Sequence, residues 1–370
     1  MRSLEGSMMP VLARTVTRRT LFAGSLGLAA GFAALRPEAL PIANAARISV
    51  ITPRLCDRAR FGVTGSLTGA APLDGVLHAT EKEIGCSFPV VGVFYSFETI
   101  WANHLPSLSD LARIPGRVLN VAWMPSKTAS TVLLTDIPKG KYDVHIDQML
   151  AGMRAYPGPV VVRFGHEMNG NWYPWSVAYP TTKPFKGCFA ASEYIAAFRY
   201  IAQRARSQAS SNVRFAFTIN ESDAGTIKTP AKAYYPGDDV VDVLAFDAYN
   251  GYSTSWKDPN KTWLRGYTTV TACTTKQCPV EIHETGCAEP YAGQRDPVTG
   301  KLASKAVWAH QMAAQTGFDR LSTVLYFASK GGRDWRFETT PIALAGFAST
   351  YDAVNSSALT SGQGVLPYEP

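Results

Sequence analysis

The chain has 370 residues, of which 46% are hydrophobic and 18% charged, which is enough apolar material for one large α/β domain or two smaller ones. Its formal charge is +7, but residues 1–45 carry five arginines against two glutamates, so the remainder has only 7 − 3 = +4. This excess is small and dispersed, with no run of Lys or Arg beyond residue 45, and it argues against nucleic-acid binding.

The first 45 residues are typical of an export signal. Arg18 and Arg19 precede an apolar stretch, residues 21–35, that contains no acid, and the small residues 43–45 follow as a cleavage site. The alternative, a transmembrane anchor, requires a longer apolar segment. The paired arginines favour the twin-arginine route of bacteria, so we expect a secreted protein that keeps no membrane contact after cleavage.

Six cysteines follow: Cys56, Cys86, Cys188, Cys273, Cys278 and Cys287. No pair has CxxC spacing and none lies at ligand spacing from a histidine, so we expect no zinc site. An even number in an exported chain favours up to three disulfides, and Cys273 with Cys278 could close a short loop. Buried free thiols are the alternative.

Short apolar runs rich in β-branched residues alternate with helical patterns along the rest of the chain. The predicted strands are 60–64, 90–95, 117–123, 160–165, 213–219, 241–247, 279–283 and 323–328. The clearest helical face is formed by Tyr194, Ala197, Phe198, Ile201, Ala202 and Ala205, and further helices are predicted at 142–156, 304–316 and 341–354. Eight such units predict a single-domain α/β fold, a (β/α)8 TIM barrel over residues 46–355, followed by a flexible tail, residues 356–370.

The carboxyl ends of barrel strands form the active face of such a fold. At the predicted strand ends the sequence places aromatic, amide and carboxylate side chains: Phe94, Tyr95, Trp123, Glu167, Asn220, Glu221, Asp247, Tyr249, Asn250, His283, Glu284 and Phe327. Aromatic rings cover the C–H faces of sugars, while amides and carboxylates satisfy their hydroxyl groups. The pattern therefore predicts a carbohydrate cleft.

Two glutamates at strand ends are the candidate catalytic residues. Glu167 ends the fourth predicted strand and Glu284 follows the seventh, and each comes after a histidine and shortly before a glycine. Hydrolysis of a glycosidic bond needs such a pair, one carboxylic acid with a raised pKa and one carboxylate. Zinc chemistry of the HExxH type is excluded because Gly170 stands four residues after His166.

The neighbours of Glu167 have plainer interpretations as well. His166 could be a core histidine, and Trp172, Tyr173 and Trp175 could be core aromatics. The spacing of the three aromatic residues is neither helical nor alternating, and this favours an exposed loop.

The stretch RFGHEMNGNWYPW, residues 163–175, closely resembles the acid/base signature of glycoside hydrolase family 26, best known for β-mannanases. PVEIHETG, residues 279–286, resembles the nucleophile site of the same retaining clan. GVFYSF, RVLNVAWMP and YYPGDDVVDVLAFDAYNGY are also similar to segments of this family, in the expected order. The resemblance covers most of residues 60–350.

The resemblance implies a retaining double displacement on a β-linked polysaccharide, with β-1,4-mannan as the first choice. Glu167 would be the general acid and then the base, and Glu284 the nucleophile. His166 would orient nucleophile and substrate, Trp172 would pack beside the scissile sugar, and Tyr249 would hydrogen-bond the nucleophile. Further candidates for substrate binding are Arg163, Asn169, Tyr173, Trp175, Asn250, Trp123, Tyr95 and Trp335. We expect a monomer with no cofactor and no metal.

Several alternatives stay open. Mixed-linkage β-glucan and β-xylan are other substrates of the family, and specificity depends on contacts around the C2 hydroxyl. A non-catalytic carbohydrate-binding barrel is a rival from another class, whereas a metal-dependent deacetylase would need a His/Asp cluster that six histidines do not supply. Glu221 and Asp223 add acids after the fifth strand, and the end of the eighth strand carries no tryptophan.

Overall fold

The computed structural model describes residues 59–65, 73–101, 111–112, 114–127, 132–183, 185–225 and 229–360. The predicted export signal, residues 1–45, lies outside the described residues, as do residues 361–370 of the predicted tail.

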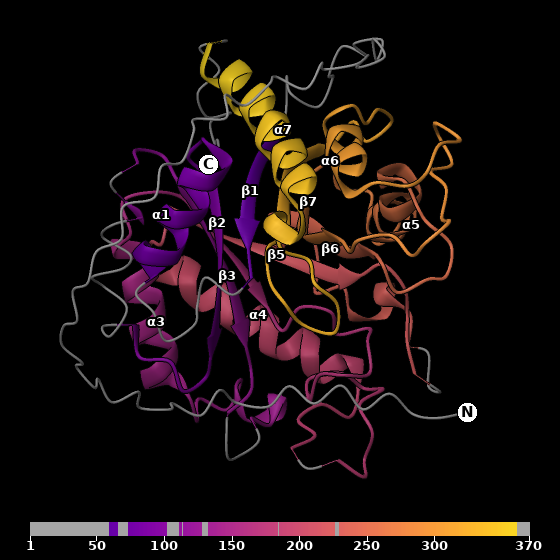
Figure 1. Ribbon diagram of the computed structural model, residues 1–370. Coiled ribbons are helices and arrows are strands. Elements are labelled where there is room, and N and C mark those ends of the chain that lie inside the picture. The colour runs from indigo at the N-terminus through magenta and orange to yellow at the C-terminus, as the bar shows by residue number, and fades with distance from the viewer. Residues whose placement is uncertain are drawn as a thin grey trace, which may run out of the picture. The chain divides into compact units, whose positions relative to one another are not determined.

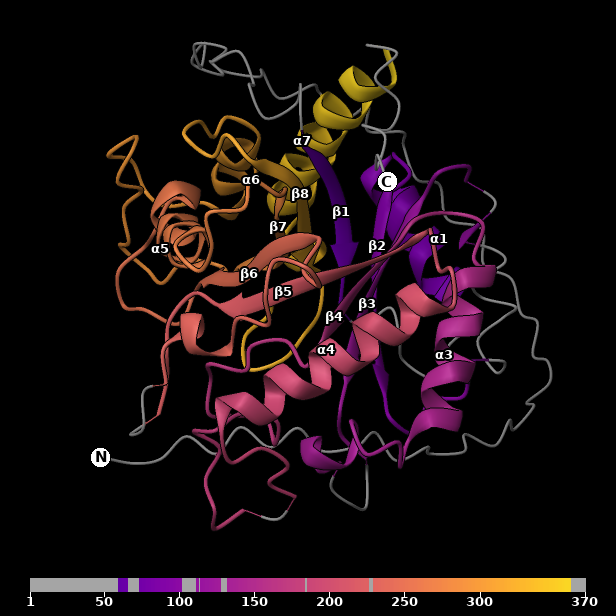
Figure 2. The same cartoon turned by 180° about the vertical axis from the view of Figure 1, so that it is seen from behind.

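Eight parallel strands close into a barrel in sequence order, and the eighth pairs with the first. They are β1 (Arg60–Thr64), β2 (Val90–Ser96), β3 (Val118–Met124), β4 (Val160–Phe164), β5 (Val213–Asn220), β6 (Val243–Asn250), β7 (Val280–Cys287) and β8 (Leu321–Phe327). Figures 1 and 2 show the strands at the centre and the helices outside them. The predicted (β/α)8 barrel is confirmed.

The helices are α1 (Leu73–Ile84), α3 (Asp143–Ala155), α4 (Ala191–Ser207), α5 (Pro259–Thr271), α6 (Lys305–Ala313) and α7 (Pro341–Thr360), with short 3-10 helices η4 (Leu134–Asp136), η5 (Ala231–Tyr234) and η6 (Phe337–Thr339). The six residues predicted as the apolar face of α4 are the six that this helix buries. The last helix continues beyond the predicted end at residue 354 to Thr360, five residues into the segment predicted as a tail.

Two apolar layers follow from the alternation of side chains along the strands. The larger cluster lies between strands and helices, while Val90, Val118, Val161, Ala216, Val243 and Leu325 form a separate, smaller cluster. On β4, Val161 and Arg163 share one face, and on β6, Val243 and Asp247 do. Because Arg163 pairs with Asp247, we infer that this face is the barrel interior, with its apolar layer below and its charged layer at the carboxyl ends.

A β-bulge in β7 interrupts this alternation. The pairing with β6 passes from Phe246–Ile282 to Asp247–Glu284, and the pairing with β8 passes from Ile282–Val324 to Thr285–Tyr326, so over these steps β7 holds one residue more than its neighbours. Earlier in the pairing with β8, between Val280 and Glu281, β8 holds the extra residue. The extra residue of β7 lets His283 and Glu284, which are adjacent in sequence, both serve the interior. A bulge re-aims side chains in this way beside many active sites.

The structure does not show the predicted disulfides, and the described cysteines exclude a set of three; Cys56 lies outside the described residues. Cys188, Cys273, Cys278 and Cys287 are free thiols. Cys273 and Cys278 do not close a loop, because the Cys273 thiol donates to the carbonyl of Thr269, while the Cys278 sulfur faces the Arg320 guanidinium.

Among the described helices, none combines the length and the apolar character that crossing a bilayer demands. Within the same residues, no group of three or more His, Cys, Asp or Glu side chains is arranged to hold a metal ion.

Candidate active site

Glu167 stands in a tight turn at the end of β4. Gly165 and Glu167 both have left-handed backbone, with φ of 54° and 53°. For a residue other than glycine this conformation costs about 1–2 kcal/mol, a strain that functional sites often store. The Trp172 indole N–H donates to Oε2 of Glu167 at 2.7 Å. Gly170 permits this contact, because a Cβ there would lie 2.5 Å from the indole ring.

Glu284 is held by side chains from two strands, β4 and β6. Nη1 of Arg163 lies 2.8 Å from Oε1 of Glu284 and 3.5 Å from Oδ2 of Asp247. The Tyr249 hydroxyl donates to Oε2 of Glu284 at 2.5 Å, a contact that the family resemblance implied. Both oxygens of Glu284 therefore have a fixed partner.

The two glutamates are electrostatically coupled. Burial first, and then the negative charge of Glu284, raise the pKa of Glu167 from 4.5 to about 8, while Trp172 and Arg163 act in the opposite direction. Burial and the charge of Glu284 also raise the pKa of Asp247 well above its ordinary value. The carboxyl groups of Glu167 and Glu284 therefore lie close enough across the barrel mouth to interact, as their positions after the fourth and seventh strands predicted.

His166 lies beside this pair in its neutral form. Burial, followed by the charges of Arg163 and His283, holds its pKa well below the ordinary range. Its ring packs edge-on against Tyr173, with centroids 5.0 Å apart, and its Nε2 lies 4.0 Å from Oε1 of Glu284. Among the described residues neither ring nitrogen has a hydrogen-bond partner. The side chain is thus available to a ligand.

Four predicted aromatic binding residues are buried, and two of them pack outside the barrel. Tyr95 and Trp123 lie one position out of phase with the interior faces of β2 and β3, so they pack against Trp101 and Phe97 outside the barrel. Trp175 is 1% exposed and donates to the carbonyl of His166, which corrects the expectation of an exposed loop. Trp335 is also buried, beneath Tyr249.

Tyr173 and Trp172 stand at the rim of the site. Tyr173 is half-buried and stacks on Trp175, with centroids 4.2 Å apart, whereas Trp172 is 43% exposed. Of the three aromatic residues predicted for the site in the loop after β4, Trp172 is therefore the one that presents its ring to solvent.

Two predicted amide ligands are engaged within the protein. Asn169 donates to the carbonyl of Asn220 and to Asp223, and accepts from the Asn220 backbone N–H, all within 3.0 Å. Asn250 accepts from the backbone of Lys257. Both amides fasten loops around the site, and Asp223, an acid that the family resemblance left unexplained, holds Asn169.

Phe94 and Asp247, which are strand-end residues but were not candidates for substrate binding, contribute to the site, and so does Tyr252. Phe94 precedes Tyr95 and has the opposite orientation, because its ring packs on the Arg163 guanidinium at 4.9 Å and near His166. Asp247 pairs with Arg163. Exposed Tyr252 contacts Tyr249 and Trp335. Strict alternation along β2 would have favoured Phe94 over Tyr95.

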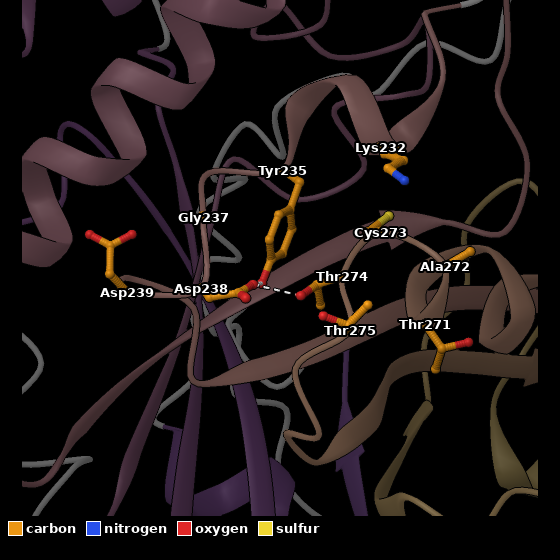
Figure 3. A pocket seen from close by; sticks show the side chains of 10 residues that line it. All are labelled: Lys232, Tyr235, Gly237, Asp238, Asp239, Thr271, Ala272, Cys273, Thr274 and Thr275. Atoms are coloured by element: carbon orange, nitrogen blue, oxygen red, sulfur yellow. Dashed lines mark hydrogen bonds between the residues drawn. The ribbon is translucent and has the colours of Figure 1, made fainter.

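A separate open hollow lies where the segment before β6 meets the turn after α5 (Figure 3). These segments lead into the amino ends of β6 and β7, whereas the glutamates lie toward the carboxyl ends of their strands. Three of its polar side chains satisfy one another, because Tyr235 and Thr274 both donate to Asp238, at 2.8 and 2.6 Å. We assign no chemistry to it.

Comparison with known proteins shows which families and structures the chain is similar to. The model of glycosyl hydrolase family 26 matches residues 142–291, which include both glutamates. The chain is 27% identical over 298 residues to endoglucanase H of Acetivibrio thermocellus, covering 79% of this chain and 31% of that protein. It is 31% identical over 107 residues to a mannan endo-1,4-beta-mannosidase of Bifidobacterium adolescentis, covering 29% of this chain and 10% of that protein. The chain thus spans less than a third of either relative.

Among solved structures, the catalytic domain of a family 26 endo-beta-1,4-mannanase from a Bacillus species superposes with a TM-score of 0.56. It shares 17% sequence identity, and the match covers 80% of this chain and 86% of that one. At this sequence identity the structural similarity shows a shared fold and nothing more.

A closed (β/α)8 barrel with two coupled carboxyl groups at its mouth is the architecture of the barrel-type glycoside hydrolases. Within this class, residues 142–291 of the chain match the model of glycoside hydrolase family 26, the family that its motifs resemble.

Proposed function

We propose that the protein is a secreted retaining glycosidase that cleaves β-1,4-mannosidic linkages in mannan-type polysaccharides. One observation carries the proposal: the two carboxyl groups share a site but have different surroundings. Glu167 is buried and holds its proton up to about pH 8, whereas Glu284 contacts a guanidinium and a phenol. Cleavage of a glycosidic bond needs this division between an acid and a carboxylate.

In the first step Glu167 gives its proton to the glycosidic oxygen while the bond from that oxygen to the anomeric carbon breaks. The carboxylate of Glu284 forms a bond to the same carbon, which gives a glycosyl ester and releases the other sugar chain as an alcohol. Arg163 and Tyr249 each hold one oxygen of Glu284, so the attacking group is oriented before substrate arrives.

In the second step the altered charge at Glu284 reverses the role of Glu167. The ester is neutral, so the Coulombic contribution that raised the pKa of Glu167 is lost. As a carboxylate, Glu167 takes a proton from a water molecule that attacks the anomeric carbon. Glu284 leaves as a carboxylate, and the sugar keeps its original configuration.

Two variants test these roles. Glu284→Ala is expected to abolish turnover on every substrate while the fold is kept. Glu167→Ala should keep the first step for aryl glycosides with a good leaving group, which need little protonation, and should accumulate the glycosyl ester. Steady-state kinetics on natural and activated substrates, with mass spectrometry of the intact protein, measure both effects.

The matched control is Glu289→Gln, in the loop after β7, which should turn over substrate normally. Equal losses for Glu167→Ala on activated and natural substrates would remove the acid role. Proton NMR of the first product reads the stereochemistry, and an inverted anomer would overturn the double displacement.

The substrate class rests on the relatives. A matched relative is named as a mannan endo-1,4-beta-mannosidase and the superposed structure as an endo-beta-1,4-mannanase, which supports mannan. The longer of the two sequence matches, over 298 residues, is to a protein named as an endoglucanase and favours β-glucan as a second candidate. Products from mannan, lichenan and xylan, separated by size, discriminate among them. Binding without new reducing ends would instead indicate a non-catalytic barrel.

We also propose that residues 1–45 direct twin-arginine export and that the mature chain is a monomer. The paired Arg18 and Arg19 ahead of an apolar stretch support export. Replacing both arginines by lysine should leave the protein in the cytoplasm of a bacterial host. Light scattering of the secreted protein would contradict the monomer if it gave twice the chain mass.

A further inference from the structure

The loops after β6 and β7 carry two large aromatic side chains that solvent reaches. Tyr252 is 71% exposed and Tyr291 is 53% exposed. With Arg333, in the loop after β8, they form what we call the tyrosine–arginine rim.

The rim begins next to the catalytic pair. The Tyr252 ring packs edge-on against Trp335 and Tyr249, with centroids 5.3 and 6.3 Å away, and Tyr249 is the residue that holds Glu284. Partial burial, and then the charges of Glu167 and Glu284, raise the pKa of Tyr252, while Arg333 lowers it. Tyr252 therefore lies within electrostatic range of the carboxyl groups on one side and of Arg333 on the other.

Tyr291 and Arg333 form the outer part of the rim. The Arg333 guanidinium lies 4.6 Å from the centre of the Tyr291 ring, and its Nη1 donates to the Tyr291 hydroxyl. Within the described residues, no carboxylate forms an ion pair with Arg333. A guanidinium has five N–H donors, so several stay available to hydroxyl groups of a ligand.

The rim is held in place by its own loops. Gln294 accepts from the backbone N–H of Tyr291 at 2.8 Å and donates to the carbonyl of Thr254 at 2.6 Å, which ties the loop after β7 to the loop after β6. Buried Asp296 accepts from two backbone N–H groups of its turn and from Gln311 of α6. The loops that carry the aromatic rings are thus tied together before any ligand binds, which lowers the entropy cost of ordering them on binding.

We propose that the tyrosine–arginine rim is a sugar-binding subsite for backbone units of the β-linked polysaccharide beyond the unit held at Glu167 and Glu284. This inference rests on the proposed function and adds that the protein prefers longer polysaccharide chains over short oligosaccharides. Exposed rings stack on sugar faces, and the free N–H groups of Arg333 bind hydroxyls. The occupant is a continuation of the substrate chain, because the rim is continuous with the catalytic residues through Tyr252, Trp335 and Tyr249.

The test compares substrates of different length. For wild type, Tyr291→Ala and Arg333→Met, kcat/KM is measured on the β-1,4-linked trisaccharide and hexasaccharide of whichever sugar the wild type hydrolyses. Each variant is expected to lower the hexasaccharide-to-trisaccharide ratio by about 3- to 10-fold, the size of one aromatic or polar contact. Leu302→Ala, an exposed residue of the same loop, is the matched control and should keep the wild-type ratio.

Binding separates this inference from the proposed function. In the Glu284→Ala background, Tyr291→Ala should weaken calorimetric binding of the hexasaccharides of β-1,4-mannose, glucose or xylose by the same factor. If the wild type hydrolyses none of the polysaccharides, the proposed function fails and binding alone tests the rim. An unchanged length ratio together with unchanged hexasaccharide affinity in both rim variants would overturn the subsite.

Discussion

The carboxyl group of Glu167 combines backbone strain, burial and a negatively charged neighbour at one residue. Its φ is 53°, and its pKa is raised to about 8 by burial and then by Glu284. Each of these costs stability, and each serves an acid that must keep its proton at neutral pH and release it on demand.

Removing the charge of Glu284 should therefore lower the pKa of Glu167. In Glu284→Gln the Coulombic cause disappears while burial remains, so the titration midpoint of Glu167 should fall below about 8. Carbon-13 NMR of labelled glutamate carboxyls measures it without any need for activity. In the wild type, kcat/KM should fall as the pH rises through about 8. Glu338→Gln, far along the chain in η6, is the control and should leave the titration midpoint of Glu167 unchanged. If Glu284→Gln also left this midpoint unchanged, the coupling between the two glutamates would be contradicted.

At the scale of elements, the contact between β6 and β7 positions Glu284, the proposed nucleophile. Tyr249 is paired with Gly286 across these strands. A Cβ at Gly286 would lie 2.9 Å from Cδ1 of Tyr249 and 3.0 Å from Cε3 of Trp335. The absence of a Cβ at Gly286 leaves room for the Tyr249 ring, whose hydroxyl reaches Glu284. The bulge, which lies just before Glu284 on β7, turns the Glu284 side chain toward Tyr249.

Gly286→Ala is expected to displace the Tyr249 ring and to lower kcat roughly 10- to 100-fold, the value of one hydrogen bond to a charged group. Tyr249→Phe should have an effect of similar size. The double variant should be no worse than either single variant, because both remove the same contact. Additive losses in kcat would show that Gly286 acts through something other than Tyr249.

The sequence predicts the elements better than the orientation of their side chains. Short apolar runs between helical patterns predict all eight strands, and the ends of those strands bring Glu167 and Glu284 to one site. Tyr95 and Trp123 were assigned to the cleft because aromatic residues suit sugars, but a side chain one position away on a strand faces the other side. The bulge of β7 could not be predicted, because it depends on the register of two neighbouring strands.

At the scale of the whole molecule, the raised pKa of Glu167 lowers the stability of the fold at higher pH. The folded chain keeps the proton of Glu167 up to about pH 8, whereas the unfolded chain releases it near 4.5. Between these pH values the folded state binds more protons than the unfolded state. The free energy of unfolding therefore falls as the pH rises from about 4.5 toward 8, and the stability that Glu167 contributes below about pH 4.5 is lost.

Glu167→Gln removes this titration and keeps an oxygen for the Trp172 indole. We expect the variant to melt at a higher temperature than wild type at pH 8, by a few degrees, with about 2–4 °C for each kcal/mol. At pH 4 the two should melt together. Calorimetry at both pH values measures the difference, and a variant that melts below wild type at pH 8 would contradict this account.

The four thiols of Cys188, Cys273, Cys278 and Cys287 have a practical consequence. All four are buried, and burial raises the pKa of Cys188 to about 12 and of Cys273 to about 11, so neither is a ready nucleophile or an easy target for oxidation. Because these sulfur atoms carry no crosslink, the barrel around them should tolerate dithiothreitol, and recombinant production would not require an oxidising host for their sake.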